Sequence, residues 1–372
     1  MNQSHEVVVI GGGQTGLSAG HHLAKRGIDF VILEARARIG DIWRSRWESL
    51  KLYSPAKYDS LPGMPFPGRG GHFPTSAEMA DYLESYAEGQ GLPVRTGVRV
   101  SRVEADGDGY AIDTSEGRYS AQQVIVASGG FRDPYVPAVS ADLAPSIRQI
   151  HSSDYLRPDQ LADGPVLVVG FSHSGADVAH EAARNGHRTT LSGVSHGQLP
   201  FSVESRRGAL MWPLLRVVAS NVLTLNTPIG RKMAPEVRKG GAPLLRYRRQ
   251  DLVADGVELR DARLVGARDG LPLLADDSVH DVATVVWCTG FKPDYSWVEP
   301  ATVDELGWPI QQRGVVEESP GLYFLGIPFQ FAFTSMLVLG AGRDAGHVVE
   351  RVARVAATRR DEPAGRYEEA VR

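Results

Sequence analysis

The sequence has 372 residues, of which 42% are hydrophobic and 23% are charged, and its formal net charge is −4. Such a chain is long enough for two or three domains with a sizeable core, and its mildly acidic balance gives no general reason to expect nucleic acid as a partner. The single cysteine, Cys288, excludes intrachain disulfides and a CxxC redox pair, and with them the dithiol reductases.

The first predicted elements are a strand, a glycine-rich turn and a helix. Residues 6–10 are an apolar, β-branched run that predicts a buried parallel strand, and residues 15–26 have helical spacing and end at Gly27. A second strand is predicted over residues 29–33, with Glu34 at its end. This order of elements is typical of a dinucleotide-binding unit.

The turn carries the pattern Gly11-x-Gly13-x-x-Gly16, in which each glycine has a physical role. Gly11 permits the tight turn, Gly13 lets the backbone approach a pyrophosphate, and Gly16 allows the helix to pack closely on the strand. Free N–H groups and the dipole at the helix N-terminus favour phosphate, and Glu34 is placed to accept hydrogen bonds from the ribose hydroxyls of an adenosine. We therefore favour a dinucleotide site over an empty glycine-rich turn.

The same order of elements returns in the middle of the chain. Residues 166–170 predict a strand, residues 175–185 a helix, and residues 187–192 another strand. Ser172 stands where the middle glycine is expected, so the turn is compatible both with a nucleotide and with a degenerate, empty site. The residues of this second candidate cofactor site are Gly170, Ser172, Ser174 and Gly175.

The strand that follows the second turn offers no residue that selects between the two nicotinamide cofactors. Ser192 and the two residues after it provide neither an acid for a ribose 2′-hydroxyl nor an arginine for a 2′-phosphate. Arg206 or Arg207 could reach in from the following loop, but both could equally be solvated surface residues. The choice between NADH and NADPH is therefore open.

The repetition extends over a whole unit, because each turn is followed by a similar closing strand. The two closing strands, in residues 124–131 and 285–291, contain a small hydroxyl residue, a glycine and a phenylalanine at nearly the same interval from the turn. This predicts an α/β fold with two related Rossmann-like, three-layer domains, the second inserted in the first. Residues 62–74 and 205–249 are predicted irregular loops that could contact substrate or form a lid.

Several further motifs, in the right order, resemble those of the flavin-containing monooxygenases and their Baeyer–Villiger relatives, with the small bacterial flavoprotein monooxygenases as the nearest likeness. The resemblance covers essentially the whole chain. The motifs that carry it are Gly40-Asp-Ile-Trp43-Arg44, Leu50 to Pro55, Leu61 to Pro67, Phe73-Pro-Thr, Ala127 to Pro134, His151 to Tyr155, Trp287 to Phe291 and Gly342-Arg-Asp344.

The resemblance implies FAD at the first turn and NADPH or NADH at the second. It implies an FAD-binding domain over residues 1–158 and 291–372, and an inserted NAD(P)-binding domain over residues 159–290. In addition to the two turns, the site residues that it implies are Glu34, Trp43 and Ser54 around FAD, Thr289 and Gly290 between the domains, and Ser128 and Gly129 as a hinge.

The chain also departs from the family pattern in two places. The signature F-x-G-x-x-x-H-x-x-x-Y occurs here as Pro145-x-Ile147-x-x-x-His151-x-x-x-Tyr155, and Pro55 stands near the position of an asparagine found in the animal-type members. His151 could titrate near neutral pH and is the weak catalytic candidate. We favour a structural role for it, as a linker histidine that orders the crossover between the domains.

The function implied by the resemblance is an FAD- and NAD(P)H-dependent monooxygenase. It would form a C4a-peroxyflavin with O2 and transfer one oxygen atom to a small organic sulfide, amine or ketone. The departures from the family pattern motivate a second hypothesis, an NAD(P)H oxidase or flavin reductase that releases H2O2. A third is a redox-sensing flavoprotein whose second site is degenerate.

No targeting or membrane-spanning pattern is evident in the sequence. The first residues lack the basic and apolar segments of a secretory signal. The longest apolar stretch, residues 209–219, contains Pro213 and Arg216 and is too short to span a bilayer. We expect a cytoplasmic protein without bound metal, whose oligomeric state the sequence leaves open, a homodimer included.

Overall fold

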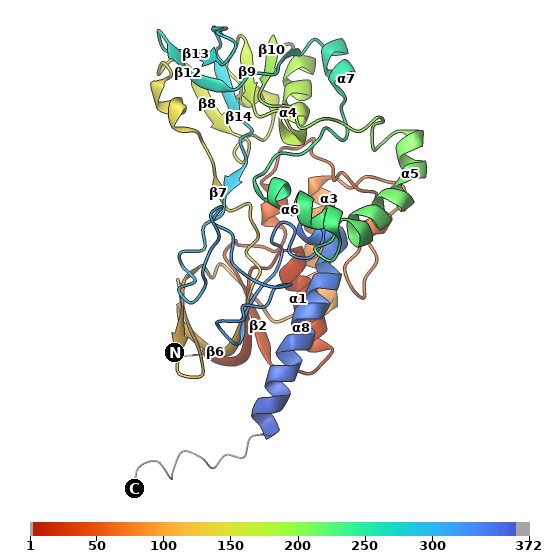
Figure 1. Ribbon diagram of the computed structural model, residues 1–372, viewed down its shortest axis with the longest axis vertical. Helices are drawn as coiled ribbons and strands as arrows, with labels where there is room; N and C mark the ends of the chain where they lie inside the picture. Colours follow the sequence, from red (N-terminus) through yellow and green to blue (C-terminus); the bar gives the residue numbers. More distant parts are fainter. Residues whose placement is uncertain (1–2, 362–372) are drawn as a thin grey trace.

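The computed structural model describes residues 3–361, which form two lobes that follow one another along the long axis of the molecule (Figure 1). Each lobe contains a mainly or wholly parallel sheet with helices packed against it, so the predicted α/β architecture with two dinucleotide-type domains is confirmed. Within this described range, no helix combines enough length with an apolar enough sequence to cross a membrane.

The first sheet contains the N-terminal strands and one strand from the end of the chain. Its order is β3-β2-β1-β6-β5-β4, and β16 pairs in parallel with β6 outside this path. The run of apolar residues in β1 predicted a strand buried on both sides, and its last four residues are indeed buried. The strands are β1 (Gln3–Ile10), β2 (Phe30–Glu34), β3 (Val94–Thr96), β4 (Val100–Asp106), β5 (Gly109–Thr114), β6 (Gly117–Val126) and β16 (Leu322–Phe324).

Helices cover one face of this sheet, where they bury an apolar core that includes Leu17, Leu83 and Val349. The three main helices are α1 (Gln14–Ala24), α3 (Ser76–Gly89) and α8 (Val338–Asp361). A second core lies on the opposite face, where residues between 295 and 327 outside β16 pack against side chains of the sheet, including those of β4 and β5. Short helical turns connect these elements: α2 (Asp41–Arg44), η1 (Ala56–Tyr58) and η5 (Phe333–Met336).

The second sheet is wholly parallel and has the order β11-β10-β9-β14-β8. Its strands are β8 (Arg148–His151), β9 (Val166–Val169), β10 (Thr189–Ser192), β11 (Glu258–Arg260) and β14 (Thr284–Trp287). Two helices, a separate hairpin and two short turns complete the lobe: α4 (His173–Arg184), α7 (Arg249–Ala254), β12 (Leu264–Arg268) with β13 (Leu271–Leu274), η2 (Ala138–Asp142) and η3 (Pro158–Gln160).

The membership of β8 in the second sheet corrects the domain boundary expected at residue 158. β8 pairs in parallel with β14, with His151 opposite Trp287. The second lobe therefore begins before Arg148. A short run of residues such as 148–151, without a glycine-rich turn after it, carried too little signal to be assigned as a sheet strand from sequence.

Two crossings connect the lobes, and they run side by side. β7 (Asp133–Pro134) pairs antiparallel with β15 (Phe291–Lys292), so the outgoing and returning chains share a two-stranded ribbon at the junction (Figure 1). After the return crossing, the chain adds β16 and α8 to the first lobe.

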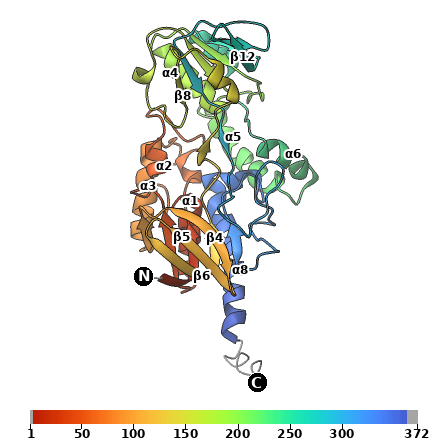
Figure 2. The same ribbon diagram turned by 90° about the vertical axis from the view of Figure 1, so that its left-hand side faces the viewer.

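The prediction that residues 205–249 are irregular is wrong. This region contains α5 (Arg206–Val217), the π-helical turn η4 (Val218–Val222) and α6 (Pro228–Arg238), which lie beside the junction of the lobes (Figures 1 and 2). The Ser205 and Thr227 side chains cap α5 and α6 by accepting hydrogen bonds from the N–H groups of Gly208 and Gly230. Each of the two helices also contains an internal proline, Pro213 in α5 and Pro235 in α6.

Candidate active site

The first glycine-rich turn joins the end of β1 to the start of α1, and its backbone leaves no room for side chains at two positions. Gly11 has φ +111°, and a Cβ placed on it would lie 2.5 Å from the carbonyl oxygen of Ala127. A Cβ on Gly16 would lie 1.9 Å from the carbonyl oxygen of Gly11. A Cβ on Gly13, in contrast, would meet no atom within 4 Å. Gly13 is thus open on the side that a pyrophosphate would approach.

Glu34 lies at the end of β2 and contacts this turn directly. One of its carboxylate oxygens accepts a hydrogen bond from the Gly12 N–H at 2.8 Å, and the other accepts one from the Arg36 N–H, also at 2.8 Å. The carboxylate is only half-buried, so it keeps access to solvent and to a ligand. These bonds hold Glu34 beside the turn, where an adenosine ribose would bind.

The second turn repeats this geometry. Gly170 has φ +124°, and a Cβ on it would lie 2.2 Å from the carbonyl oxygen of Cys288. A Cβ on Gly175 would lie 1.9 Å from the carbonyl oxygen of Gly170, which is the distance found for Gly16 and Gly11 in the first turn. Ser172 is the N-cap of α4 but makes no capping hydrogen bond with its side chain, and Ser174 is half-buried in the first turn of the helix. The replacement of glycine by Ser172 therefore leaves the fold of the turn intact.

The end of β10 carries no charged residue, but the adjacent strand β11 and the helix α7 each place an arginine near it. The Ser192 hydroxyl donates a hydrogen bond to the carbonyl of Ala262 at 2.9 Å, so its proton is not available to bond a ligand. Arg260 lies opposite Ser192 on β11. The guanidinium of Arg249 lies 5.0 Å from the ring centroid of Phe171, inside the second turn, and pairs with Asp261. Sequence spacing alone did not identify Arg249, which contacts the turn from α7, or Arg260, which lies on the adjacent strand, because both come later in the chain.

Ser54 is hydrogen-bonded to a buried carboxylic acid, Asp59, which was not identified from the sequence. The Ser54 hydroxyl donates a hydrogen bond to Oδ1 of Asp59 at 2.6 Å, and Asp59 is only 1% exposed. Burial raises the pKa of Asp59 to about 7, against the opposing effect of the Ser54 hydrogen bond. Its second oxygen and the indole N–H of the half-buried Trp43 are buried without a partner among the described residues.

The residues expected between the domains lie at the paired crossings. Gly129 and Gly290 have φ +70° and +77°, a conformation that favours glycine. The Thr289 hydroxyl donates a hydrogen bond to the carbonyl of Tyr135, whose N–H in turn donates to the carbonyl of Gly290 at 2.9 Å. Ser128 precedes Gly129 at the end of the outgoing strand and is half-buried. Thr289 and Gly290 thus bond to the outgoing chain at Tyr135, while the Gly129 carbonyl accepts a hydrogen bond from Tyr295.

His151 contacts the returning chain at Gly290 and Phe291 and is almost fully buried. Its Nε2 donates a hydrogen bond to the carbonyl of Gly290 at 3.0 Å, and its Nδ1 lies 2.9 Å from the Ser153 hydroxyl. Burial lowers the pKa of His151, although the hydrogen bond to Gly290 acts in the opposite direction. A neutral imidazole with both nitrogens engaged favours the structural role over the catalytic one.

A buried charged cluster, which sequence reasoning also missed, joins the two lobes. Arg246 donates hydrogen bonds to Oδ2 of Asp177 on α4 at 2.9 Å and to the carbonyls of Lys51 and Leu52 in the first lobe at 2.9 and 3.1 Å. The Tyr53 hydroxyl donates to the same Asp177 oxygen at 2.7 Å. Burial raises the pKa of Asp177 to about 6, although Arg246 acts in the opposite direction.

The aromatic part of this cluster reaches the second turn. The ring of Tyr53 stacks on that of His173, the first residue of α4, with centroids 4.7 Å apart. Burial and the nearby Arg246 lower the pKa of His173 to about 4, so it is neutral at physiological pH. Because Tyr53 is adjacent to Ser54, one short segment connects the second turn with the buried acid Asp59.

Two more buried polar groups lie close together in the sequence, before and within α8. Gln330 is 1% exposed, and both its amide nitrogen and its amide oxygen lack partners in the described part of the chain. Asp344 is 3% exposed; one oxygen accepts a hydrogen bond from Arg343 at 2.8 Å and the other lacks a partner within residues 3–361. Unsatisfied buried polar atoms are costly, so these groups fit a polar ligand.

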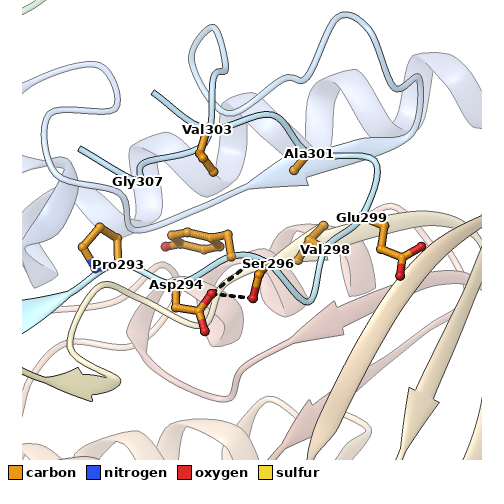
Figure 3. Close-up of a pocket in the computed structure, with 9 residues that line it drawn as sticks. Pro293, Asp294, Ser296, Val298, Glu299, Ala301, Val303 and Gly307 are labelled. Atoms are coloured by element: carbon orange, nitrogen blue, oxygen red, sulfur yellow. Dashed lines mark hydrogen bonds between the residues drawn. The ribbon is translucent and has the colours of Figure 1, made fainter. Parts of the chain in front are cut away.

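Two cavities lie away from the glycine-rich turns. One, of about 220 Å³, is lined by the return chain between Pro293 and Gly307, and Figure 3 shows Asp294 bonded to Ser296 at its edge. The other, of about 270 Å³, is lined by residues that include Lys51, Arg184 and Arg246, next to the charged cluster. Neither includes a residue of the two turns, so neither is the candidate cofactor site.

Comparisons with known proteins agree with this geometry. A family model described as pyridine nucleotide-disulphide oxidoreductase matches residues 8–203. An uncharacterized CzcO-like oxidoreductase of Geobacillus kaustophilus is 36% identical over 348 residues, which are 93% of this chain and 98% of the relative. The indole-3-pyruvate monooxygenase YUCCA1 of Oryza sativa subsp. japonica is 26% identical and covers 93% of this chain and 90% of its own length. The structure of a flavin-containing monooxygenase from Stenotrophomonas maltophilia matches with a TM-score of 0.76 and 28% identity, over 95% of this chain and 99% of the other.

These matches confirm the resemblance inferred from the motifs and the prediction of an oxidoreductase of the flavin monooxygenase type. The only cysteine of the sequence, Cys288, is buried behind the second turn, so a dithiol pair of the kind suggested by the family description has no counterpart in this chain. This chain belongs to the pyridine nucleotide-disulphide oxidoreductase family, in the branch that contains the flavin-containing monooxygenases.

Proposed function

We propose that this protein is an FAD- and NAD(P)H-dependent monooxygenase that oxygenates a small organic sulfide, amine or ketone. The observation that carries the proposal is the duplicated turn. Both turns exclude side chains at the first and last glycine through the same backbone contacts, and both stand at the end of a central parallel strand. Two such turns in one chain fit one enzyme that uses two dinucleotides.

FAD fits the first lobe and a nicotinamide dinucleotide the second. The open side of Gly13, the N-terminus of α1 and the Glu34 carboxylate suit the pyrophosphate and ribose of FAD. The unpartnered atoms of Trp43, Asp59 and Asp344 suit its polar ring and ribityl groups. Gly170, Ser172, Ser174 and Gly175 would hold NADH or NADPH, and the second domain would extend from about β8 to Gly290.

The bound flavin would supply the redox chemistry, by accepting hydride from NAD(P)H and then reacting with O2 to deliver one oxygen atom to the substrate. The protein's own groups would orient the two cofactors and manage protons. Asp59, with a pKa of about 7, can hold or release a proton in a site closed to bulk water. Tyr53 and Arg246 fix the second lobe against the segment that carries Ser54.

The substrate class follows from the family and is the part of the proposal that most needs testing. The rice relative is an indole-3-pyruvate monooxygenase, so oxo acids belong in the panel beside sulfides, amines and ketones. The second candidate function is an NAD(P)H oxidase that releases H2O2. It is favoured by Pro55, Pro145 and Ile147, which replace family residues.

The test begins with the protein as purified. It should be yellow and should release FAD, and not FMN, on denaturation. Its flavin should be reduced anaerobically by NADH or NADPH, and O2 uptake should then be compared with H2O2 release while each substrate class is added. Oxygenated product with little H2O2 supports the monooxygenase, whereas stoichiometric H2O2 with every substrate supports the oxidase. A colourless protein that does not take up FAD would contradict both.

A further inference from the structure

The outer face of α5 carries an unusual row of exposed apolar side chains. Leu210, Leu214 and Val217 are spaced by four and three residues, so they share one face of the helix. They are 80%, 54% and 43% exposed, and Leu210 is the most exposed large hydrophobic residue among those described. Val222 on η4 and Ile229 at the start of α6 continue the exposed apolar surface along the chain.

The opposite face of α5 packs against the first lobe, so the apolar row is exposed although the helix is held in place. Trp212 is half-buried, and its ring centroid lies 5.7 Å from that of Tyr58 in the first lobe. Thr224, just beyond η4, pairs with Ala332 as an isolated β-bridge. Arg238 of α6 donates hydrogen bonds to the carbonyls of Pro328 and Phe329. The α5–α6 segment, residues 205–241, is therefore held against the first lobe while its apolar row faces outward.

Basic residues surround this row. Residues 205–241 contain seven arginines and lysines but a single acid, Glu236, which pairs with Lys239 at 2.9 Å. All of the basic side chains except Arg238 are exposed. This contrasts with the net charge of −4 for the whole chain. The segment is thus a strongly basic, apolar patch on an acidic protein.

We propose that the α5–α6 segment docks the protein on the surface of an anionic lipid bilayer. Exposed aliphatic side chains on one helix face, flanked by arginines and lysines, are the features that bury a helix at the headgroup boundary and attract anionic lipid. A second copy of this chain fits less well, because a symmetric contact would place the same basic residues against each other. The proposal concerns peripheral docking and is independent of the reaction catalysed.

The experiment is flotation of the purified full-length protein with vesicles. We expect it to float with vesicles of phosphatidylcholine and phosphatidylglycerol in equal parts, and far less with phosphatidylcholine alone or in high salt. The double variant R206Q/R207Q should bind roughly twentyfold more weakly, since each basic residue near an anionic surface contributes about fivefold. The double variant L210Q/L214Q should lose at least as much, because the apolar row no longer enters the headgroup region.

A matched control removes equally exposed apolar residues elsewhere. Val253 on α7 and Val265 on β12 are each 57% exposed, and V253Q/V265Q should bind vesicles as the wild type does. Circular dichroism and thermal unfolding verify that each variant is folded. Equal binding to both kinds of vesicle, or equal loss in the control, would overturn the proposal. So would light scattering that shows a wild-type dimer dissociated by L210Q/L214Q without any vesicle binding, since the row would then be a contact between copies.

Discussion

Replacing Asp59 with asparagine should remove a pH dependence from the stability of the protein. Asp59 is 1% exposed, and the Ser54 hydroxyl donates to one of its oxygens at 2.6 Å while the other lacks a partner among the residues described. An asparagine has nearly the same shape, and its amide oxygen can accept the same hydrogen bond. The substitution therefore changes the ionisation at this position and little else.

The sign and size of the effect follow from the raised pKa. The folded protein keeps the Asp59 proton up to about pH 7, whereas the unfolded chain releases it near the ordinary value of 3.8. Between these values the folded state binds more protons, so the free energy of unfolding falls as the pH rises. A shift of this size corresponds to about 4 kcal/mol, present below pH 4 and lost above pH 7. The asparagine variant has no proton to lose at this position and should not show this fall.

The assay is urea unfolding of the wild type and of Asp59→Asn at several pH values between 4.5 and 8, spanning the window of about three pH units set by the shift. The difference in unfolding free energy between the two proteins should change in favour of the variant by about 3 kcal/mol across this range, because part of the effect lies below pH 4.5. Glu116→Gln, a change at an exposed carboxylate, is the control and should follow the wild type. Parallel curves for wild type and Asp59→Asn would refute the assignment of a proton to Asp59.

Three further predictions concern the two turns, the charged cluster and the junction. Gly13→Leu should fold but lose FAD, because its side chain enters the open space at the first turn where the pyrophosphate would bind. Ser172→Leu should stay yellow, and its flavin should be reduced slowly by NAD(P)H but normally by dithionite. The flavin-to-protein absorbance ratio measures FAD retention, and anaerobic stopped flow measures the reduction rate. Arg246→Met leaves the carboxylate of Asp177 buried without its cation, so the free energy of unfolding measured in urea should fall by about 3–5 kcal/mol. Arg246→Lys should recover part of this loss. An unchanged urea midpoint in Arg246→Met would show that the cluster does not stabilise the protein. His151→Gln should keep its steady-state rate within an order of magnitude, since a general base contributes about 100-fold or more; a larger loss would restore His151 as a catalytic residue.

The parts of the site that depend on backbone geometry were predictable from the sequence. From the sequence, Gly11 was assigned to the tight turn and Gly16 to close helix–strand packing, and in the structure the carbonyls of Ala127 and Gly11 leave no room for a Cβ at these positions. The second turn was predictable for the same reason, and the contacts of Gly170 and Gly175 match those of the first turn. A glycine pattern reflects steric limits within a short segment, and such limits can be inferred from consecutive residues of the sequence.

The parts that depend on long-range packing were not predictable. Asp59 stands in a mixed stretch of sequence, two residues after Lys57, and only the fold around it shows that it is buried. Arg246 stands in a basic stretch of the sequence with nothing to mark it as buried, yet its guanidinium is buried against Asp177, far away in the sequence. The helix α5 was missed because residues 205–249 were interpreted as an irregular loop, although the spacing of Leu210, Leu214 and Val217 was a usable helical signal.

The two lobes contact each other at several places, and two of these contacts limit how the lobes can move. At the junction, the β7–β15 ribbon and His151 tie the crossings to each other. Further along the interface, Arg246 and Tyr53 tie α4 to the segment before Ser54. A rotation about the ribbon alone would pull Arg246 from its carbonyl partners and leave buried polar atoms unpaired, at a cost of several kcal/mol. A large swing of the second lobe must therefore break this cluster, which lies where the second turn meets the first lobe at Tyr53 and His173.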